Sequence, residues 1–143
     1  MSVRQVSIFL ENTAGRLAEV TRVLAREGID IRALSLADTS DFGVLRIIVN
    51  EPDRCLETLK QNSFVARTSE VVAVEVEDKP GGMSRVLDAL DAAGLNVEYM
   101  YAYVAKAGEN AVVICKIDER EQALKALKAE GIRTISAAGL EGL

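Results

Sequence analysis

Two short polar loops contain the residues best suited to bind a small charged molecule. One is Asn12-Thr13-Ala14-Gly15, and the other, in the second half of the chain, is Asp78-Lys79-Pro80-Gly81-Gly82. Each loop follows an alternating run typical of a strand and precedes apolar residues at helical spacing. The N–H groups at the start of such a helix can receive a carboxylate, and the Asn12 or Asp78 oxygen can accept from an ammonium group. An amino acid carries both groups, so the loops indicate a site for its zwitterionic head group.

The same polar residues have a plainer interpretation. Asn12 and Asp78 are also typical of helix capping or turn formation. Asp30 and Asn96 each follow a glycine that ends the helix, and both are typical of turns at the start of a strand. These alternatives remain open on the sequence alone.

The two loops differ in charge and in shape. Asp78 is charged where Asn12 is neutral, and Gly82 stands where the first loop has Arg16. Two adjacent glycines allow closer approach to the backbone, whereas Arg16 would crowd or neutralise the first loop. The second loop is therefore favoured if only one of them binds a ligand.

The loops belong to an internal repeat. The segment Val6–Leu34 aligns with Val72–Met100 without a gap, and the matching positions are apolar residues, glycines and one polar loop pair. Such a repeat indicates two units of one fold and two pseudo-equivalent sites. The identical pairs are Val6/Val72, Glu11/Glu77, Gly15/Gly81, Val20/Val86, Leu24/Leu90 and Gly28/Gly94.

Each copy predicts the element order β-α-β-β-α-β. In the first copy we expect strands at 6–10, 29–36, 44–49 and 65–68, a turn at 39–41, a helix ended by Gly28, and a second helix capped by Asn50. In the second we expect strands at 71–76, 95–104, 111–117 and 133–136, a helix ended by Gly94, and another begun by an Asp118–Glu121 capping box. The tail after 136 is expected to dock or fray. Right-handed crossovers would place both helices on one face of an antiparallel sheet. The predicted class is α+β, with two ferredoxin-like domains at 1–69 and 70–143.

Composition excludes several classes of protein. Hydrophobic residues make up 49% of the 143 residues, which excludes a disordered chain, and the apolar runs are too short to span a membrane. The net charge of −5 and the scattered basic residues argue against nucleic acid as a partner. The chain has no histidine, which removes histidine-based metal sites and histidine general bases. No metal site and no cofactor are predicted. Cys55 and Cys115 are expected to be buried, reduced thiols, and with no signal peptide visible the expected location is cytoplasmic.

The predicted strands of the first copy are apolar on both faces. Leu34 and Leu36 alternate with Ile31 and Ala33, and both sets are largely apolar. A sheet that is apolar on both faces is normally covered on both. We therefore predict a homodimer that buries the helix-free face.

Three tyrosines, Tyr99, Tyr101 and Tyr103, alternate along one predicted strand and so share one face. They suit ordinary strand or interface packing. They also suit the wall of a ligand pocket, because the corresponding residues of the first copy, Ala33, Ser35 and Ala37, are small.

The two loops and the strand starts that follow each first helix resemble the signature of ACT domains. The first copy reads Glu11-Asn12-Thr13-Ala14-Gly15-Arg16-Leu17, closed by Glu27-Gly28-Ile29-Asp30-Ile31. The second reads Glu77-Asp78-Lys79-Pro80-Gly81-Gly82-Met83, closed by Ala93-Gly94-Leu95-Asn96-Val97, and its Pro-Gly is the closer match. The resemblance covers nearly the whole chain. It implies a module that senses small molecules, usually amino acids, with ligand sites where the first loop meets another unit's strand. The ligand contacts it implies are Asn12, Ala14, Gly15, Asp30, Ile31, Asp78, Pro80, Gly81, Gly82, Met83, Asn96, Val97 and Tyr99.

The leading hypothesis is therefore a regulatory protein that binds an amino acid, possesses no catalytic activity and signals to another protein. A second hypothesis is an interaction subunit of a metabolic enzyme without ligand binding of its own. Catalysis is disfavoured, although the topology can host it, because the chain shows no nucleophile–base pair and no glycine-rich nucleotide motif.

Overall fold

The computed structural model describes residues 2–38 and 41–143. Its contacts divide the chain into two compact units. The first unit is Arg4–Ser69, and the second comprises Glu70–Leu143 together with Ser2 and Val3. The predicted domains, 1–69 and 70–143, stay a prediction. Of the turn predicted at 39–41, Thr39 and Ser40 lie outside the described residues.

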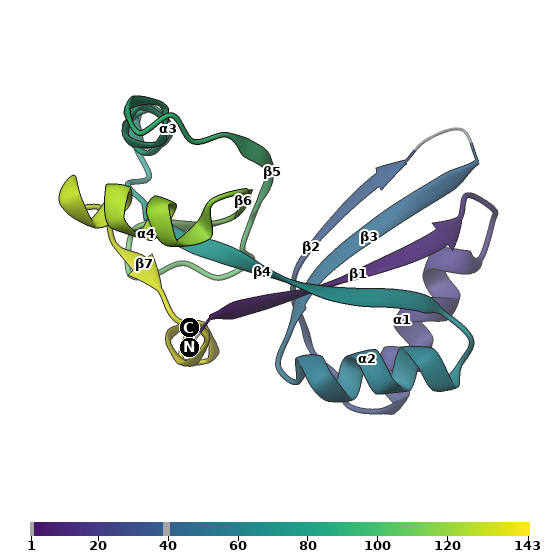
Figure 1. Cartoon of the computed structure of the whole chain (residues 1–143). Coiled ribbons are helices and arrows are strands. Elements are labelled where there is room, and N and C mark those ends of the chain that lie inside the picture. The colour runs from purple at the N-terminus through teal and green to yellow at the C-terminus, as the bar shows by residue number, and fades with distance from the viewer. Residues whose placement is uncertain (1, 39–40) are drawn as a thin grey trace. The chain divides into compact units, whose positions relative to one another are not determined.

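The first unit has the predicted β-α-β-β-α-β order. It is built from β1 (Val3–Glu11), α1 (Arg16–Arg26), β2 (Ile31–Asp38), β3 (Phe42–Val49), α2 (Pro52–Gln61) and the beginning of β4 (Val65–Val76). The strands lie side by side in the order β2-β3-β1-β4, and β3 is antiparallel to both of its neighbours. Helices α1 and α2 lie together beside these strands (Figure 1).

The second unit repeats this order and adds a terminal helix. After β4 come α3 (Gly82–Ala92), β5 (Val97–Ala102), β6 (Ala111–Ile117), α4 (Arg120–Ala129), β7 (Thr134–Ile135) and α5 (Ala137–Glu141). Its strands lie in the order β5-β6-β4-β7 and pair antiparallel. Both units therefore have the predicted α+β, ferredoxin-like fold.

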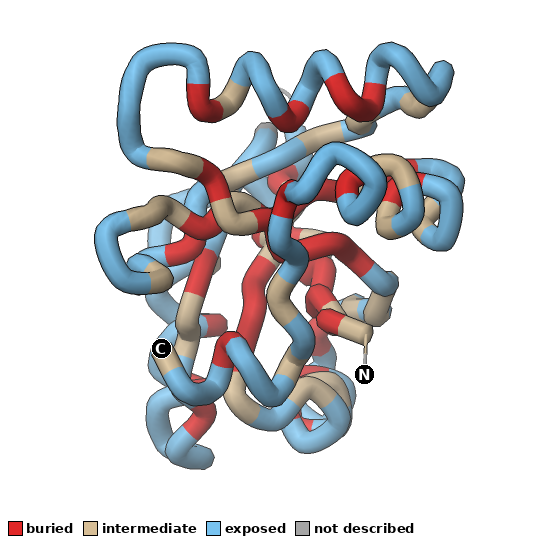
Figure 2. The backbone as a smooth tube through the Cα atoms, turned by 90° about the vertical axis from the view of Figure 1, so that its left-hand side faces the viewer, coloured by how far each residue is buried: buried red, intermediate tan, exposed pale blue. Residues whose placement is uncertain are grey.

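Each unit has its own hydrophobic core between its sheet and its helices. In the first unit, Val6 and Ile8 of β1 pack with Val20 and Leu24 of α1 and with Leu59 of α2. Buried positions recur at intervals along the helices, as expected of helices with one apolar face (Figure 2). The second unit builds the equivalent core from β4, β6, α3 and α4.

The two cysteines lie in these two cores. Cys55 and Cys115 are both fully buried and form no disulfide. Burial raises the pKa of Cys55 to about 12 and that of Cys115 to about 11. Both are therefore protonated thiols at neutral pH, as the sequence predicts.

The first helix of each unit ends at the predicted glycine. Gly28 and Gly94 have φ angles of 69° and 71°, in the left-handed region that glycine adopts without strain. The residue after each glycine returns a hydrogen bond to the helix, Ile29 N–H to Leu24 O and Leu95 N–H to Leu90 O, both at 3.0 Å.

The predicted caps of the second helices were wrong. Glu51 and Glu119 occupy the N-cap positions, and neither forms a side-chain cap. Pro52 takes the first helical position, which makes residue 51 the cap. The Asn50 Oδ1 atom instead accepts the N–H of Asp30 at 3.0 Å, so Asn50 fixes the start of β2.

Several strand limits also differ from the predicted ones. The strands predicted at 65–68 and 71–76 form one uninterrupted strand, β4, which continues through Ser69 and Glu70. Strand β5 is shorter than the predicted 95–104, since the chain leaves the ladder for a hairpin closed by a bridge between Ala107 and Asn110.

The C-terminal tail docks as a short helix. Ser136 Oγ accepts the N–H of Gly139 at 3.1 Å and caps α5. Leu140 is 3% exposed, and its carbonyl oxygen accepts the hydroxyl of Tyr103 at 3.4 Å. The half-buried Tyr99 and Tyr101 share one face of β5, as their spacing predicts, and the buried Tyr103 lies just beyond the end of that strand.

Two exposed apolar residues of the first unit lie on the strand at an edge of its sheet. Leu34 and Leu36 of β2, the outermost strand, are 55% and 50% exposed. They pair with the core residues Ile47 and Leu45 and therefore point to the helix side. By contrast, Ala33 on the helix-free face is buried. Exposed apolar surface thus lies on the helix side of the edge strand as well as at Phe42, which is 61% exposed and pairs with Glu11 on the helix-free face. The homodimer through the helix-free face stays a prediction.

Replacement of Leu140 by alanine tests the docking of α5. We expect Leu140→Ala to lower the free energy of unfolding by about 2–3 kcal/mol, because the side chain is almost completely buried. Leu87→Ala is the control, since Leu87 is 36% exposed and should cost less than about 1 kcal/mol. Urea denaturation measures both values. Equal losses in the two variants would show that α5 is not docked.

Candidate functional site

The two predicted loops share one backbone conformation. Gly15 has φ 89° and ψ −16°, and Gly81 has φ 86° and ψ −8°, so a left-handed glycine precedes each first helix. The hydrogen bonds also correspond: Thr13 N–H to Glu11 O and Lys79 N–H to Glu77 O at 2.9 Å, Glu19 N–H to Gly15 O at 2.9 Å, and Arg85 N–H to Gly81 O at 3.1 Å. The repeat therefore preserves the loop in detail.

Neither Asn12 nor Asp78 caps its helix. The N-cap positions belong to Gly15 and Gly81, and no side chain caps either helix. The capping interpretation of the two polar residues was therefore wrong. In the second unit Arg85 N–H is bonded to the cap residue, and the N–H groups of the preceding helical residues have no partner within the helix. Each loop thus places a polar side chain near the positive end of a helix dipole.

The Asp78 carboxylate forms an ion pair. Lys106 Nζ, from the β5–β6 hairpin, lies 2.7 Å from Asp78 Oδ2, and both side chains are more than half exposed. The pKa of Asp78 is lowered, mainly by the hydrogen bond from Lys106 and to a smaller extent by the positive charge of Lys106. The sequence did not predict this contact, because Lys106 lies in an irregular segment without periodicity. On the first loop, the backbone N–H of Asn12 donates to Asp41 O at 2.9 Å and extends the β1–β3 pairing.

Packing accounts for the second glycine of the second loop. A Cβ atom on Gly82 would lie 2.0 Å from the carbonyl oxygen of Glu77. In the first unit the Arg16 N–H to Thr13 O distance is 3.4 Å, whereas Gly82 N–H to Lys79 O is 3.0 Å, so the first turn is wider at this position. The second loop, as it is built, therefore has no room for a side chain at residue 82, independently of any role in backbone access.

The side chain of Arg16 lies against Phe64, which follows α2, and against its own helix. Its guanidinium carbon is 4.7 Å from the centre of the Phe64 ring, and Nη1 pairs with Glu19 at 3.0 Å. The charge of Arg16 is thus engaged by an aromatic face and a carboxylate of its own helix.

Within one unit, the loop and the start of the second strand lie at opposite ends of the sheet. Glu11, at the end of β1, is paired with Phe42, whereas Ile31, at the start of β2, is paired with Val49. Phe42 and Val49 are the two ends of β3, and α1, with 11 residues, spans about 16 Å between the two sites. Asn12, Ala14 and Gly15 therefore do not meet Asp30 and Ile31 of the same unit.

The same separation holds in the second unit. Val76, just before the loop, pairs with Ala111, whereas Val97 pairs with Ile117 at the other end of β6. Asp78, Pro80, Gly81, Gly82 and Met83 therefore lie together at the start of α3, while Asn96, Val97 and Tyr99 lie beyond its end. Two clusters per unit result, and neither contains the whole predicted set.

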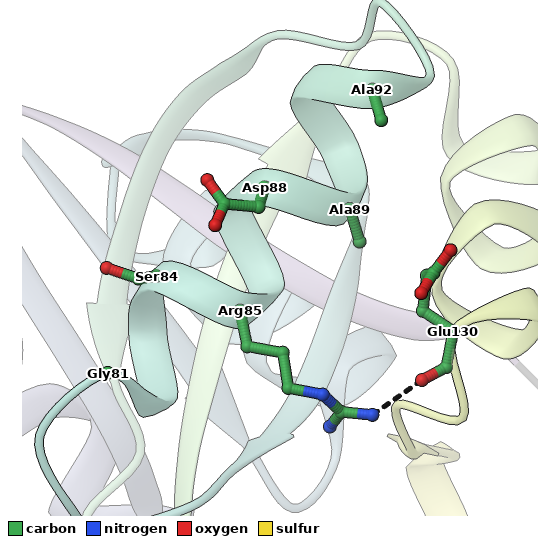
Figure 3. A pocket seen from close by; sticks show the side chains of 7 residues that line it. All are labelled: Gly81, Ser84, Arg85, Asp88, Ala89, Ala92 and Glu130. Atoms are coloured by element: carbon green, nitrogen blue, oxygen red, sulfur yellow. Dashed lines mark hydrogen bonds between the residues drawn. The ribbon is translucent and has the colours of Figure 1, made fainter.

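A groove of about 460 Å³ runs along the outer side of α3 and reaches the end of α4. Figure 3 shows Arg85 extending across it, with Nη2 donating to the carbonyl oxygen of Glu130 at 2.5 Å. Glu130 is the C-cap of α4, so Arg85 satisfies that helix end. The groove includes Gly81 but no other predicted site residue; its lining is Gly81, Ser84, Arg85, Asp88, Ala89, Ala92 and Glu130.

The described residues contain neither a metal-binding cluster nor a helix that could span a membrane. At residues 2–38 and 41–143, no group of three or more Cys, Asp or Glu residues is placed to hold a metal ion. Within the same residues, no helix has both the length and the apolar character needed to cross a membrane.

The fold, together with the loop that occurs in both units, defines a pair of ACT domains. A family model described as an ACT domain pair matches residues 1–141, and the chain belongs to this family. A crystal structure of a protein from Bacteroides thetaiotaomicron is 38% identical, covers 100% of this chain and 98% of that chain, and has a TM-score of 0.92. No curated protein sequence matches the chain.

More distant structures share the fold. The ligand-free regulatory subunit of aspartate kinase from Thermus thermophilus is 20% identical, covers 91% of this chain and 93% of that chain, and has a TM-score of 0.66. The corresponding subunit from Thermus flavus is 18% identical, with the same coverage and a TM-score of 0.63. At these identities the likeness supports the fold alone.

Gly82→Ala tests the packing of the second loop. The added Cβ would overlap the backbone oxygen of Glu77, and no side-chain movement can relieve that overlap. We therefore expect a loss of about 1–3 kcal/mol in the free energy of unfolding. Ser84→Ala, in the first turn of the same helix and at an exposed position, should change it by less than about 0.5 kcal/mol. Urea unfolding of both proteins decides, and an unaffected Gly82→Ala protein would contradict the packing account.

Proposed function

We propose that the chain is a regulatory, non-catalytic protein that binds an amino acid through its ACT loops. The observation that carries this proposal is the shared geometry of the two loops. In both copies of the repeat, a left-handed glycine and a polar side chain precede helix N–H groups that have no partner in their own helix. Helix N–H groups suit a carboxylate, and the oxygen of Asn12 or Asp78 suits an ammonium group. Membership in the ACT domain pair family supports the same function.

We further propose that each ligand is shared between two units. The loop cluster and the cluster at the start of the second strand lie at opposite ends of a helix of about 16 Å, which an amino acid head group cannot bridge. A loop of one unit would therefore combine with the strand start of another, in the same chain or in a second copy. A ligand held this way favours one arrangement of the units over another, which provides a signal.

The partner is proposed to be an enzyme of amino-acid metabolism, in the cytoplasm. A protein of the same fold, the regulatory subunit of aspartate kinase from Thermus thermophilus, motivates this proposal. The alternative function is an interaction subunit without ligand binding of its own.

We also propose a homodimer formed through the exposed edge of the first unit. Leu34 and Leu36 are about half exposed on the outermost strand, and an edge strand has unpaired backbone groups that can pair with another strand. A second copy of β2 would satisfy both features.

Binding of amino acids tests the main proposal. In a thermal-shift panel of the proteinogenic amino acids, we expect at least one to raise the melting temperature, because it binds only the folded chain. Calorimetry with that amino acid should show about a tenfold weaker Kd for Asp78→Ala, which loses a charged acceptor, and a smaller loss for Asn12→Ala. A larger loss with Asn12→Ala would make the first loop the principal site. If no amino acid shifts the melting temperature, the interaction-subunit alternative is favoured.

Light scattering tests the homodimer. At micromolar concentration we expect twice the 15.4 kDa mass of the chain, and Leu36→Glu should return it to the monomer mass, because a buried unpaired carboxylate opposes pairing. Val104→Glu is the control, since Val104 is 77% exposed in the β5–β6 hairpin. A wild-type protein at the monomer mass would refute the dimer.

A further inference from the structure

The β5–β6 hairpin of the second unit is longer than its counterpart in the first. Leu34 pairs with Ile47, whereas Met100, its equivalent in the repeat, pairs with Cys115, and more of the chain lies between the second pair. The extra length is ordered by hydrogen bonds: Tyr103 N–H donates to Val112 O at 2.8 Å, and Ala107 and Asn110 exchange two bonds of 3.0 Å. Lys106 directly precedes this bridge.

The hairpin brings the Lys106 ammonium group to the second loop. Its Nζ atom lies 2.7 Å from Asp78 Oδ2, and Asp78 is the residue that the proposed function assigns to the ammonium group of an amino acid. We infer that Lys106 is a specificity-determining residue of the second loop, because its ammonium group competes with that of the ligand for Asp78. This inference rests on the proposed function.

The competition follows from the chemistry of the two groups. A lysine side chain and an amino acid both present a primary ammonium ion, and two such ions at one carboxylate repel each other. Because Lys106 belongs to the same chain as Asp78, it is present at the second loop at a fixed effective concentration. The pair is exposed, and exposed ion pairs change an equilibrium by about fivefold at most. Lys106 therefore moderates the affinity without blocking the site.

The ion pair also reduces the charge difference between the two loops. Asp78 is negative and Asn12 is neutral, but Lys106 compensates the charge of Asp78. Removal of the Lys106 charge should leave a negative loop, which favours a cationic amino acid over an acidic one. The second loop should then prefer L-lysine to L-aspartate more strongly than the wild type does.

Calorimetry of Lys106→Met tests this inference with a matched control. Lys79→Met removes the same charge from the same loop, where Lys79 is also exposed and pairs with Glu77 at 2.7 Å, but it leaves Asp78 untouched. Each proteinogenic amino acid is titrated into wild type and both variants. We expect Lys106→Met to lower the Kd about two- to fivefold, with the largest gain for L-lysine and the smallest for L-aspartate, and Lys79→Met to leave it near the wild-type value.

A double variant, and a comparison of which proteins bind an amino acid, distinguish the possible outcomes. Asp78→Asn combined with Lys106→Met should lose the gain; a gain that persists overturns the inference, as would an equal gain in Lys79→Met. A Kd that stays unchanged or rises in Lys106→Met, while wild type binds, overturns the inference and leaves the proposed function intact. Binding that appears only in Lys106→Met supports the inference. No binding to any of the proteins overturns the proposed function, and the inference with it.

Discussion

A single left-handed glycine determines the geometry of each unit's first crossover. Gly15 and Gly81 reverse the chain between the first strand and the first helix, at φ angles that other residues rarely adopt. The helix begins at the next residue, so the glycine fixes both where the helix starts and where its first N–H groups point. The packing of Val20 or Val86 onto the sheet follows from that start. The candidate site is therefore a consequence of the same turn that makes the core possible.

The crossover also explains why the predicted ligand contacts are divided between two clusters. A right-handed β-α-β connection must carry the chain back along the sheet before the second strand begins. The loop and the start of the second strand are then separated by the length of the helix, in both units and whatever their side chains. A module of this kind can bind a ligand with both clusters only when two units come together. In the proposed function, ligand binding and the arrangement of units are coupled for this reason.

Features that depend on local chemistry could be predicted from the sequence. Gly28 and Gly94 ended their helices where expected, and Tyr99 and Tyr101 share one face of β5 as their alternation predicts. Features that depend on a choice between a local partner and one distant in the sequence could not. An asparagine before a helix can cap it or bind elsewhere, and Asn50 binds the backbone of Asp30, which a different part of the chain brings near.

Contacts made by irregular segments could not be predicted from the sequence either. Helix α5 is too short for periodicity to reveal, and Lys106 reaches Asp78 from a hairpin whose length has no counterpart in the first unit. The polar part of the candidate site could be predicted from its loop, but the group that neutralises it could not.

The structure separates two differences between the loops that looked alike in the sequence. Gly82 replaces Arg16, and the carbonyl oxygen of Glu77 explains the glycine without any ligand. Asp78 replaces Asn12, and here helix capping offers no explanation, because neither side chain caps a helix and the N-cap glycines of the two loops have nearly the same φ and ψ. The start of the helix does not depend on the side chain at position 78, and the fold fixes the backbone there. That side chain can therefore change at little cost to stability. Position 78, with the charge of Lys106 against it, is therefore where a difference in ligand choice between the two units would arise.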